Sequence, residues 1–463
     1  MMGIWSTLRS DIVLGVRRLL QSPGFALVSV LTLAIGIGGN TAVFTLIDRV
    51  VLKPLPVQRP SELYRLGDAD DCCVNSGLAG SFSLFSYDLL NHLREAAPQF
   101  SQLAAFQALP RAITIGRADG GTPPETLNGA FVSGNYFQTF GLVPAAGRLL
   151  QPSDDERGAA PVAVISHRAW RDRFDARADI AGSAVTLNGV AATVIGVAPQ
   201  GFSGETLRPN PPDVWVPLAS EPALQPAARL IEAKGSHWLY AIGRLKPGTA
   251  IAPIESQLTA ALQRWIGSTL DLSEDDRREI PQQHINVVSA ARGVTSVRDG
   301  VAPSLQLLQA IAAAVLLIAC ANLANLLFAR GMAQRLDTAV RVALGAPRGR
   351  LVSQALVESL LLAGAGGVAG LLVAFAGARA IIELAFRGAT HVPVDPSPSP
   401  MVIGFALGVS LLTGAVFGVL PAIAGSRSDP IDAMRGAGRS SGERGPWVRR
   451  SLVALQVALS LVL

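Results

Sequence analysis

Long uncharged apolar blocks alternate with ordinary polar sequence along this chain. Four of the blocks have the length of a membrane-spanning helix, which needs about 20 mainly apolar residues. They are residues 23–47, 301–329, 359–378 and 396–426. A further apolar run at 451–463 is too short to cross a bilayer. We interpret it as the start of a fifth span that is cut off by truncation.

Arginines follow these blocks unevenly. The stretch before the first block has three, the loop after the second has five and the segment after the fourth has six, whereas the 386–400 loop after the third has one. Lys and Arg in short loops mark the cytoplasmic side. The N-terminus, the 331–350 loop and the 427–450 segment are therefore predicted to be cytoplasmic, and residues 52–300 to lie outside the membrane.

These observations predict a membrane α-helical bundle of four complete helices and the start of a fifth. A large α+β periplasmic domain is inserted between the first and second spans. The expected order is a cytoplasmic amphipathic helix at 1–22, span 1 at 23–51, the periplasmic domain at 52–300, span 2 at 301–330, a cytoplasmic coupling loop at 331–350, span 3 at 351–385, a short periplasmic loop at 386–400, span 4 at 401–426, a cytoplasmic linker at 427–450 and the truncated start of span 5 at 451–463.

The first helix has an apolar stripe. Its members recur every three or four residues and are Trp5, Leu8, Ile12, Val16 and Leu19. A basic amphipathic helix of this kind suits the inner membrane surface. The alternative is a soluble helix packed on the protein's own cytoplasmic side.

The segment 52–300 is long enough for a core of its own, in two lobes. Short strands alternate with helices without a repeated βαβ period, which indicates α+β. Asn188-Gly189 predicts a two-residue hairpin turn. The expected elements are strands at 161–166 and 238–245, a hairpin at 184–197, and helices at 86–95 and 252–267.

Composition and motifs exclude most enzyme classes. The chain is 49% hydrophobic and 16% charged, below the roughly 25% charged residues of soluble domains. Its net charge of +5 comes from arginines beside the apolar blocks, so nucleic acid is not an expected partner. No phosphate-binding loop, H-E-x-x-H motif or metal-ligand spacing occurs. We predict no catalytic, cofactor or metal site, and the roles of Cys72 and Cys73 stay open.

Several polar residues fall at membrane depth. Asn40, Asn322, Asn325 and Glu358 can mark a conduction path. The structural alternative is hydrogen bonding between helices or a position near the membrane interface, and we favour this alternative. Glu358 is expected to reach toward Arg350. Glycines four residues apart, such as 366 and 370, 404 and 408, or 414 and 418, allow helices to approach closely.

Six stretches together resemble the permeases of MacB/FtsX-type ABC transporters, and most closely the duplicated orphan permease group. The first, SPGFA at 22–26 with LTLAIGIGGNTAVF at 31–44, resembles their first span. The others are VSGNYF at 132–137, LNG at 187–189, VIGV at 194–197, ACANLANLLFAR at 319–330 and DTAVRVALGA at 337–346. Together they extend over nearly the whole chain, in order.

Two features depart from the family pattern. The cytoplasmic signature begins with Asp337 where the family usually has Glu. The tail RRSLVALQVALS at 449–460 resembles the start of the second copy that duplicated members carry. The resemblance therefore implies that this chain is the N-terminal half of a larger permease, pseudo-dimeric through a missing second half or homodimeric.

The resemblance also implies a mechanism. An ATP-binding cassette ATPase subunit docks on the cytoplasmic face, and its movement passes through a coupling helix to the spans and the periplasmic domain. The residues that match the coupling segment are Asp337, Arg341, Ala343, Leu344, Gly345, Ala346 and Arg348. The arginines offer positive charge to an acidic groove on the partner. The alternative is that their only effect is to fix the orientation of the spans in the membrane.

The expected function is that of a non-enzymatic permease subunit in the inner membrane. It would couple ATP hydrolysis on a partner to export or release of a substrate. A membrane-anchored regulator whose external domain activates a periplasmic partner is the alternative, and an orphan permease without transport is a third. Membrane lipid is an expected partner in each case.

Overall fold

Two compact units make up the protein. The computed structural model describes residues 2–68, 74–75, 78–117, 123–294, 296–333, 347–387, 391–392, 395–426 and three positions after 450. One unit contains residues 1–51, 300–387 and 394–463, and the other contains 52–299 together with 388–393. The second unit falls between the first and second predicted spans, apart from its short 388–393 segment.

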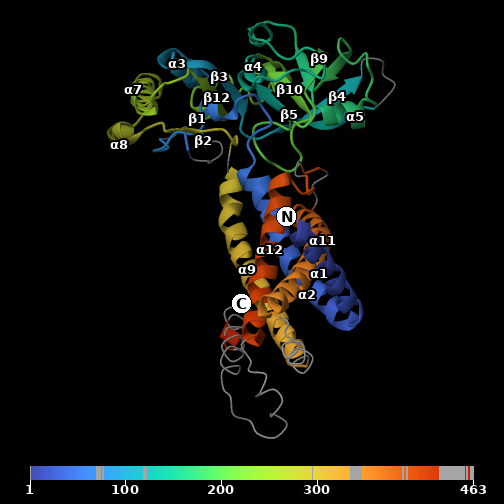
Figure 1. The fold of residues 1–463 in the computed structure, drawn as a ribbon. Coiled ribbons are helices and arrows are strands. Elements are labelled where there is room, and N and C mark those ends of the chain that lie inside the picture. The colour runs from blue at the N-terminus through green and yellow to red at the C-terminus, as the bar shows by residue number, and fades with distance from the viewer. Residues whose placement is uncertain are drawn as a thin grey trace. The chain divides into compact units, whose positions relative to one another are not determined.

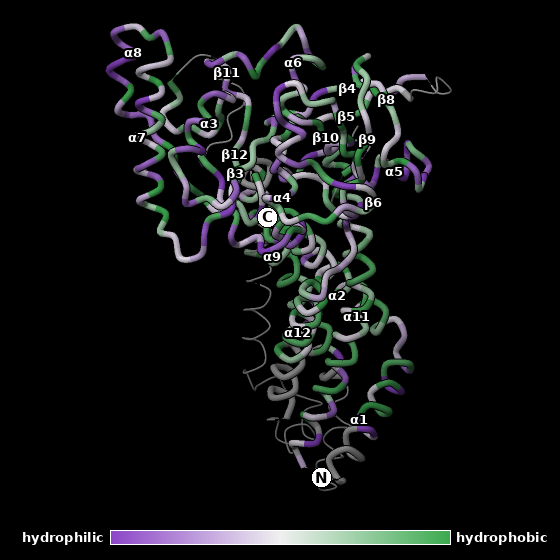
Figure 2. Tube along the Cα trace, turned by 90° about the horizontal axis from the view of Figure 1, so that it is seen from above, coloured by the Kyte–Doolittle hydropathy of each residue, from purple (hydrophilic) through white to green (hydrophobic). Residues whose placement is uncertain are grey.

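The first unit is a bundle of long helices (Figure 1). They are α1 Met2–Leu20, α2 Pro23–Leu46 with its π-helical continuation η1 Ile47–Leu52, α9 Ser296–Ala333, α11 Arg348–Ala385 and α12 Pro400–Ser426. Figure 2 shows α2, α11 and α12 as hydrophobic over most of their described length. The sequence blocks therefore correspond to helices, with bounds within a few residues of the predicted ones.

Three stretches of the described residues are long and apolar enough to cross a membrane. They are Pro23–Leu52, Gly300–Leu327 and Val352–Ala385. In α12 the apolar described stretch, Pro400–Val416, is shorter, although the helix itself has 27 residues. The fourth span stays a prediction, and the start of a fifth at 451–463 lies almost entirely outside the described residues.

Small residues let α2 and α11 approach closely. A Cβ atom added at Gly38 would lie 2.7 Å from Val373 Cβ and 2.9 Å from the Gly370 carbonyl oxygen. One added at Gly366 would lie 2.6 Å from Leu33 Cβ. The predicted role of the 366 and 370 glycines in helix packing is thus confirmed, whereas 404 and 408 have no described atom within 4 Å.

The amphipathic helix α1 packs through its polar side. Asp11 is 3% exposed, and Gly15 faces Leu361 of α11 so closely that an added Cβ would lie 2.9 Å from its Cδ1. Ile12 and Val16 of the apolar stripe remain 39% and 41% exposed. These two residues of the stripe therefore do not pack on the protein, and a lipid surface is an environment that suits them.

In the second unit, eleven described strands join in one sheet with two parts. Six strands close into a ring in the order β10-β7-β9-β8-β4-β5, because β10 pairs with both β7 and β5. Two of these pairings, β10 with β5 and β7 with β9, are parallel. Strands β3, β12, β1 and β13 form the other, antiparallel part. The two predicted lobes correspond to these two parts of a single unit (Figure 1).

The strands and short helices of this unit have the following bounds. The ring strands are β4 Arg111–Arg117, β5 Glu125–Val132, β7 Val162–Ile165, β8 Ala184–Leu187, β9 Val190–Val197 and β10 Val214–Pro217. The remaining strands are β1 Leu63–Leu66, β2 Val74–Asn75, β3 Phe100–Gln107, β6 Ala146–Gly147, β11 Ser236–His237, β12 Leu239–Leu245 and β13 Val287–Ser289. The helices are α3 Tyr87–Ala96, α4 Tyr136–Phe140, α5 His167–Arg173, α6 Glu221–Leu224, α7 Ile251–Thr269 and α8 Glu274–Glu279.

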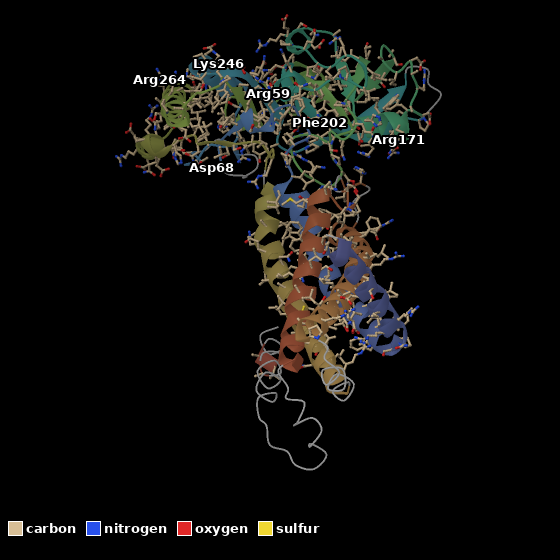
Figure 3. The ribbon with its side chains drawn as sticks, viewed as in Figure 1. Arg59, Asp68, Arg171, Phe202, Lys246 and Arg264 are labelled. Atoms are coloured by element: carbon tan, nitrogen blue, oxygen red, sulfur yellow. The ribbon has the colours of Figure 1, made fainter. Side chains whose placement is uncertain are left out.

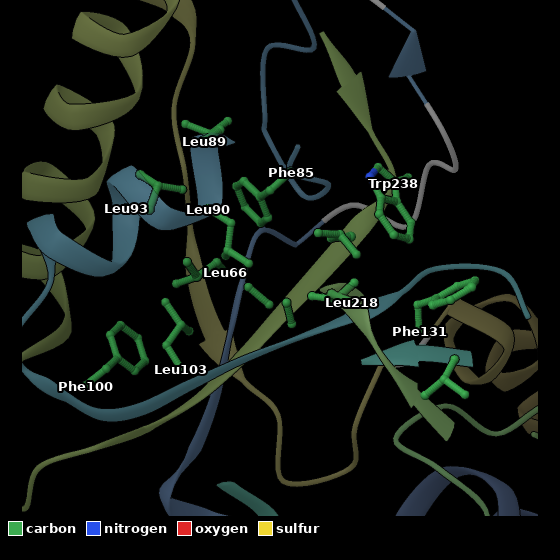
Figure 4. Packing of buried hydrophobic residues seen from close by; sticks show 14 of the residues in the cluster. Leu66, Phe85, Leu89, Leu90, Leu93, Phe100, Leu103, Phe131, Leu218 and Trp238 are labelled. Atoms are coloured by element: carbon green, nitrogen blue, oxygen red, sulfur yellow. The ribbon is translucent and has the colours of Figure 1, made fainter. Parts of the chain in front are cut away.

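The local patterns fold as predicted. Asn188 and Gly189 have φ angles of 48° and 83°, which the two-residue hairpin turn between β8 and β9 requires. All five residues of the predicted apolar face of α7 are buried, namely Ile254, Leu258, Ala261, Leu262 and Trp265. Helix α3 contacts α7, and both contribute to a large apolar core with β3 and β12 (Figure 4).

A buried histidine fixes the start of α3. The side-chain oxygen of Ser86 caps the helix by accepting from the Leu89 amide at 3.3 Å. The Ser86 amide in turn donates to His237 Nδ1 at 3.1 Å. His237 is 1% exposed, and burial lowers the pKa of its imidazole to about 4. The ring is therefore neutral at physiological pH.

Candidate coupling site

The predicted coupling segment lies mostly outside the described residues. The residues outside the described part of the chain are Asp337, Arg341, Ala343, Leu344, Gly345 and Ala346. Of Arg348 only the backbone is described, and this residue is the first of α11. The structure does show the two helices from which this segment extends. Helix α9 ends at Ala333, and α11 begins at Arg348 after Pro347.

A single arginine joins four helices near the end of α9. Arg330 Nη1 lies 3.0 Å from Glu358 Oε1 of α11, an ion pair without hydrogen-bond geometry. Its guanidinium carbon lies 4.6 Å from the centre of the Phe25 ring of α2. Nη2 donates to the Arg18 carbonyl oxygen of α1 at 3.2 Å. We call these four residues the Arg330 clamp.

The environment of the clamp makes its charges interdependent. The side chains of Arg330 and Glu358 are 15% and 14% exposed, so both are largely withdrawn from water. A partly buried charge is costly when it loses its partner. The expected pairing of Glu358 with Arg350 is wrong: its partner is Arg330, which α9 brings to the facing turn of α11.

A second link joins α2 and α9 deeper in the bundle. Asn40 is 3% exposed, and its Nδ2 donates to the Gly36 carbonyl at 3.1 Å and to the Ala312 carbonyl at 2.6 Å. Gln309 Nε2 donates to Asn40 Oδ1 at 2.9 Å. For Asn40, the helix-to-helix interpretation is therefore confirmed.

At the other end of α2, polar groups contact the start of α12. Arg49 Nη2 donates to the Ser397 carbonyl at 2.7 Å, and Ser399 Oγ donates to Asp48 Oδ2 at 2.8 Å. The Ser399 hydroxyl also accepts from the Val402 amide at 3.2 Å. The same serine thus caps α12 and ties its first turn to the end of α2.

The connection between α11 and α12 is bonded into the second unit. The Asn210 amide donates to the His391 carbonyl at 2.9 Å, and the His391 amide donates to Asn210 Oδ1 at 3.0 Å. Asn128 Nδ2 of ring strand β5 donates to the Asn210 carbonyl at 3.0 Å. We call the reciprocal pair the Asn210–His391 clip, since it attaches the α11–α12 connection to the sheet.

Charges surround the clip. Arg168 of α5 forms an ion pair with Asp213, the residue that also accepts from the Asn128 amide at 3.2 Å. Burial raises the pKa of Asp213, and Arg168 opposes the shift. Burial and the positive charge of Arg168 lower the pKa of His391. Arg171, on α5 in Figure 3, contributes in the same direction.

The clip and the ion pair of the clamp were not among the predicted site residues. Opposite charges at the inner ends of two spans are a weak sequence signal for the Arg330–Glu358 pair. Asn210 has a φ angle of 51°, which asparagine tolerates better than most residues, and two prolines follow it. These features predict a turn, yet they carry no information about His391, 181 positions away.

Comparison with known families accounts for both units. The MacB-like periplasmic core domain matches residues 26–261, and the FtsX-like permease C-terminal domain matches residues 310–430. The first match alone extends over more than half of the chain. Together the two matches include most of the second unit and the helices that follow it in the chain.

Known proteins agree with this architecture. The macrolide export ATP-binding/permease protein MacB of Escherichia coli O157:H7 is 26% identical over 309 residues, 65% of this chain and 42% of that protein. The chain thus spans less than half the length of this relative. The protein of Escherichia coli strain K12 with the same name shows the same identity and shares.

Among solved structures, the periplasmic region of MacB from Actinobacillus actinomycetemcomitans is 15% identical, with a TM-score of 0.35, over 53% of this chain and 94% of that one. The extracellular domain of the ABC-type transporter YknZ from Gram-positive bacteria is 14% identical, with a TM-score of 0.31, over 44% and 95%. The family matches and the membrane-length helices agree with an inner-membrane protein that carries a periplasmic domain. The chain belongs to the MacB/FtsX-type family of ABC transporter permeases.

Proposed function

We propose that this chain converts ATP hydrolysis on a separate ABC ATPase into movement of its periplasmic unit, for the export or release of a substrate. The observation that carries the proposal is the Arg330 clamp. It joins α9 to α1, α2 and α11 near the segment that the ATPase would contact. A push on the 331–350 segment would therefore move several helices together.

The clip supplies the outward part of the proposed route. Helices α11 and α12 belong to the first unit, but residues 388–393 of the connection between them belong to the second. A displacement of α11 would pull on His391, and through Asn210 and Asn128 on strand β5. In this proposal the movement passes through the protein's own hydrogen bonds, so a substrate need not pass between the helices.

The first test is ATPase stimulation in proteoliposomes that contain the full-length permease and a candidate ABC ATPase. Arg341→Glu reverses a predicted docking charge, and Gly345→Trp adds bulk to the same segment. We expect each variant to abolish stimulation. Arg439→Glu, in the predicted cytoplasmic linker, is the matched charge reversal and should retain it. Full stimulation by both loop variants would refute the assignment of the coupling segment.

The second test addresses the clip by hydrogen exchange of the same assembly. Addition of ATP should change exchange in the periplasmic unit of the wild type. Asn210→Gly removes the Oδ1 acceptor and tolerates the positive φ, but it leaves the backbone bond to the His391 carbonyl, so it should weaken that change. Asn210→Asp retains an acceptor and should preserve it. Equal ATP responses in the two variants would exclude the Asn210 side chain from the route.

A further inference from the structure

The segments that connect the periplasmic unit to η1 and to α9 are bonded to each other. The Leu55 amide, shortly after η1, donates to the Ala291 carbonyl at 2.9 Å. The Gly293 amide donates to the Ala290 carbonyl at 2.9 Å and closes a turn before α9 begins, in which Gly293 has a φ angle of 79°. A displacement of α2 or of α9 would therefore arrive at the same turn.

Glu205 contacts this turn through its backbone. The Val294 amide donates to the Glu205 carbonyl at 3.0 Å. A Cβ atom added at Gly293 would overlap the same carbonyl oxygen, so only glycine permits this approach. The contact is thus a close fit between two segments that are far apart in the sequence.

The side chain of Glu205 is anchored in the core of the unit. Glu205 is 5% exposed, and its Oε2 accepts from the hydroxyl of Tyr136, a fully buried residue of α4. Its Oε1 accepts from the Thr206 hydroxyl at 3.0 Å and lies 3.5 Å from Arg208 Nη2. A buried carboxylate requires such partners. We call Glu205, Tyr136 and Val294 the Glu205 bracket, because Glu205 joins the turn before α9 to α4.

Helix α4 also contacts the segment that follows η1. The Gln58 amide donates to the Phe140 carbonyl at 3.3 Å. Arg244 Nη2 of β12 donates to the carbonyls of Gln58 and Thr139, at 2.7 and 3.2 Å. The start of α4 is thus tied to the connection with α9, and its end is tied to the connection with η1.

We propose that Glu205 is a positioning residue of the coupling route and passes a displacement of α9 to α4. Its carbonyl takes up the displacement at Val294, and its carboxylate passes the displacement to Tyr136. Because the carboxylate is buried, separating it from Tyr136 would leave polar groups unsatisfied, which is costly. This inference rests on the proposed function and adds a route that is separate from the clip, which leads to β5.

The test is hydrogen exchange of the full-length permease with its candidate ABC ATPase in proteoliposomes, measured at α4 and at β5 with and without ATP. Gly293→Ala pushes the turn away from Glu205. It should reduce the ATP-dependent change in α4 about twofold, because the link through Gln58 remains, and should leave the change in β5. Gly248→Ala is the matched control, since Gly248 has a φ angle of 77° but no described atom lies within 4 Å of an added Cβ. It should respond as the wild type does.

Side-chain variants separate positioning from stabilisation. Tyr136→Phe removes the hydroxyl that holds the carboxylate and should reduce the response of α4 as Gly293→Ala does. Glu205→Gln keeps an acceptor for that hydroxyl and should retain the response. Tyr87→Phe on α3 is the matched control. If the bracket only stabilised the unit, the variants would change exchange without ATP and leave the ATP-dependent difference in α4 intact. Thermal unfolding verifies that each variant is folded.

The outcomes distinguish this inference from the proposed function. If ATP changes exchange in β5 and α4 of the wild type, and Gly293→Ala or Tyr136→Phe keeps the full change in α4, the role of Glu205 is overturned and the proposed function stands. If ATP changes neither element of the wild type, both are overturned. Without ATP, Gly293→Ala should raise the exchange rate of the Val294 amide about tenfold, the effect of one lost hydrogen bond. An unchanged rate would also overturn the role of Glu205.

Discussion

Arg330 shows how one side chain can serve four helices. A guanidinium is planar, always charged and able to donate in several directions. In this protein the group pairs with Glu358, lies over the ring of Phe25 and donates to the carbonyl of Arg18. A lysine has neither the fork of donors nor the flat face, so it could satisfy only part of this set.

The clamp predicts an asymmetric pair of effects on stability. Arg330→Met leaves the Glu358 carboxylate without its counter-charge and should cost about 2–4 kcal/mol. Glu358→Met leaves Arg330 two of its three contacts and should cost less. The double variant should be more stable than Arg330→Met alone, because no charge is stranded. Thermal unfolding in detergent measures all three, and strictly additive losses would contradict a coupled pair.

His237 predicts an acid-sensitive periplasmic unit. The imidazole has a pKa of about 4 in the folded protein, against 6.5 in its ordinary state. Between these values the unfolded chain takes up a proton that the folded chain does not, so stability falls as the pH drops from 6.5 toward 4 and the effect levels off below that. The full contribution is about 3 kcal/mol.

The pH effect is measured as a difference between variants. His237→Gln keeps an acceptor for the Ser86 amide without the titration, so its melting temperature should fall less between pH 7 and pH 4.5 than that of the wild type. His284→Gln replaces an exposed histidine and should follow the wild-type curve. A His237→Gln curve parallel to the wild type would show that this group does not carry the acid sensitivity.

At the scale of elements, two adjacent glycines of α2 give a matched comparison. A Cβ at Gly38 would meet Val373 and the backbone of Gly370 at less than 3.0 Å, whereas a Cβ at Gly39 meets no described atom within 4 Å. Gly38→Ala should therefore separate α2 from α11 and cost about 1–3 kcal/mol. Gly39→Ala should be neutral or slightly stabilising. The measurement is the melting temperature of each variant in detergent. Equal melting temperatures for Gly38→Ala and Gly39→Ala would mean that α2 and α11 do not pack as tightly as described.

The sequence predicts elements better than it predicts contacts. The length of the uncharged apolar runs identified the long helices, and the Asn188-Gly189 pair identified a hairpin. Apolar residues spaced three or four apart identified the buried face of α7. The closed ring of strands was not foreseen, because its parallel pairings join β5 to β10 and β7 to β9 across long loops. The partners of Glu358 and Asn210 depend on how helices and loops pack in three dimensions, which no local pattern encodes.

At the scale of the whole molecule, the proposed route needs a defined orientation. The ATPase segment and the periplasmic unit must lie on opposite sides of the membrane. One span before the periplasmic unit and three after it would place the arginine-rich 1–22, 331–350 and 427–450 segments on one side. A charged loop is costly to translocate, so the arginine distribution, rather than the fold of either unit, supports this arrangement.

Cysteine labelling in spheroplasts tests the arrangement. In a background with Cys72, Cys73 and Cys320 replaced by serine, a membrane-impermeant maleimide should label Ser203→Cys directly, since Ser203 belongs to the periplasmic unit. Ser440→Cys, in the predicted cytoplasmic linker, should react only after the membrane is permeabilised. Prior labelling with a permeant reagent verifies that both cysteines can react. If Ser440→Cys reacts in intact spheroplasts and Ser203→Cys does not, the orientation is inverted; the segment proposed to receive the ATPase would then face away from ATP, and the coupling route would be untenable.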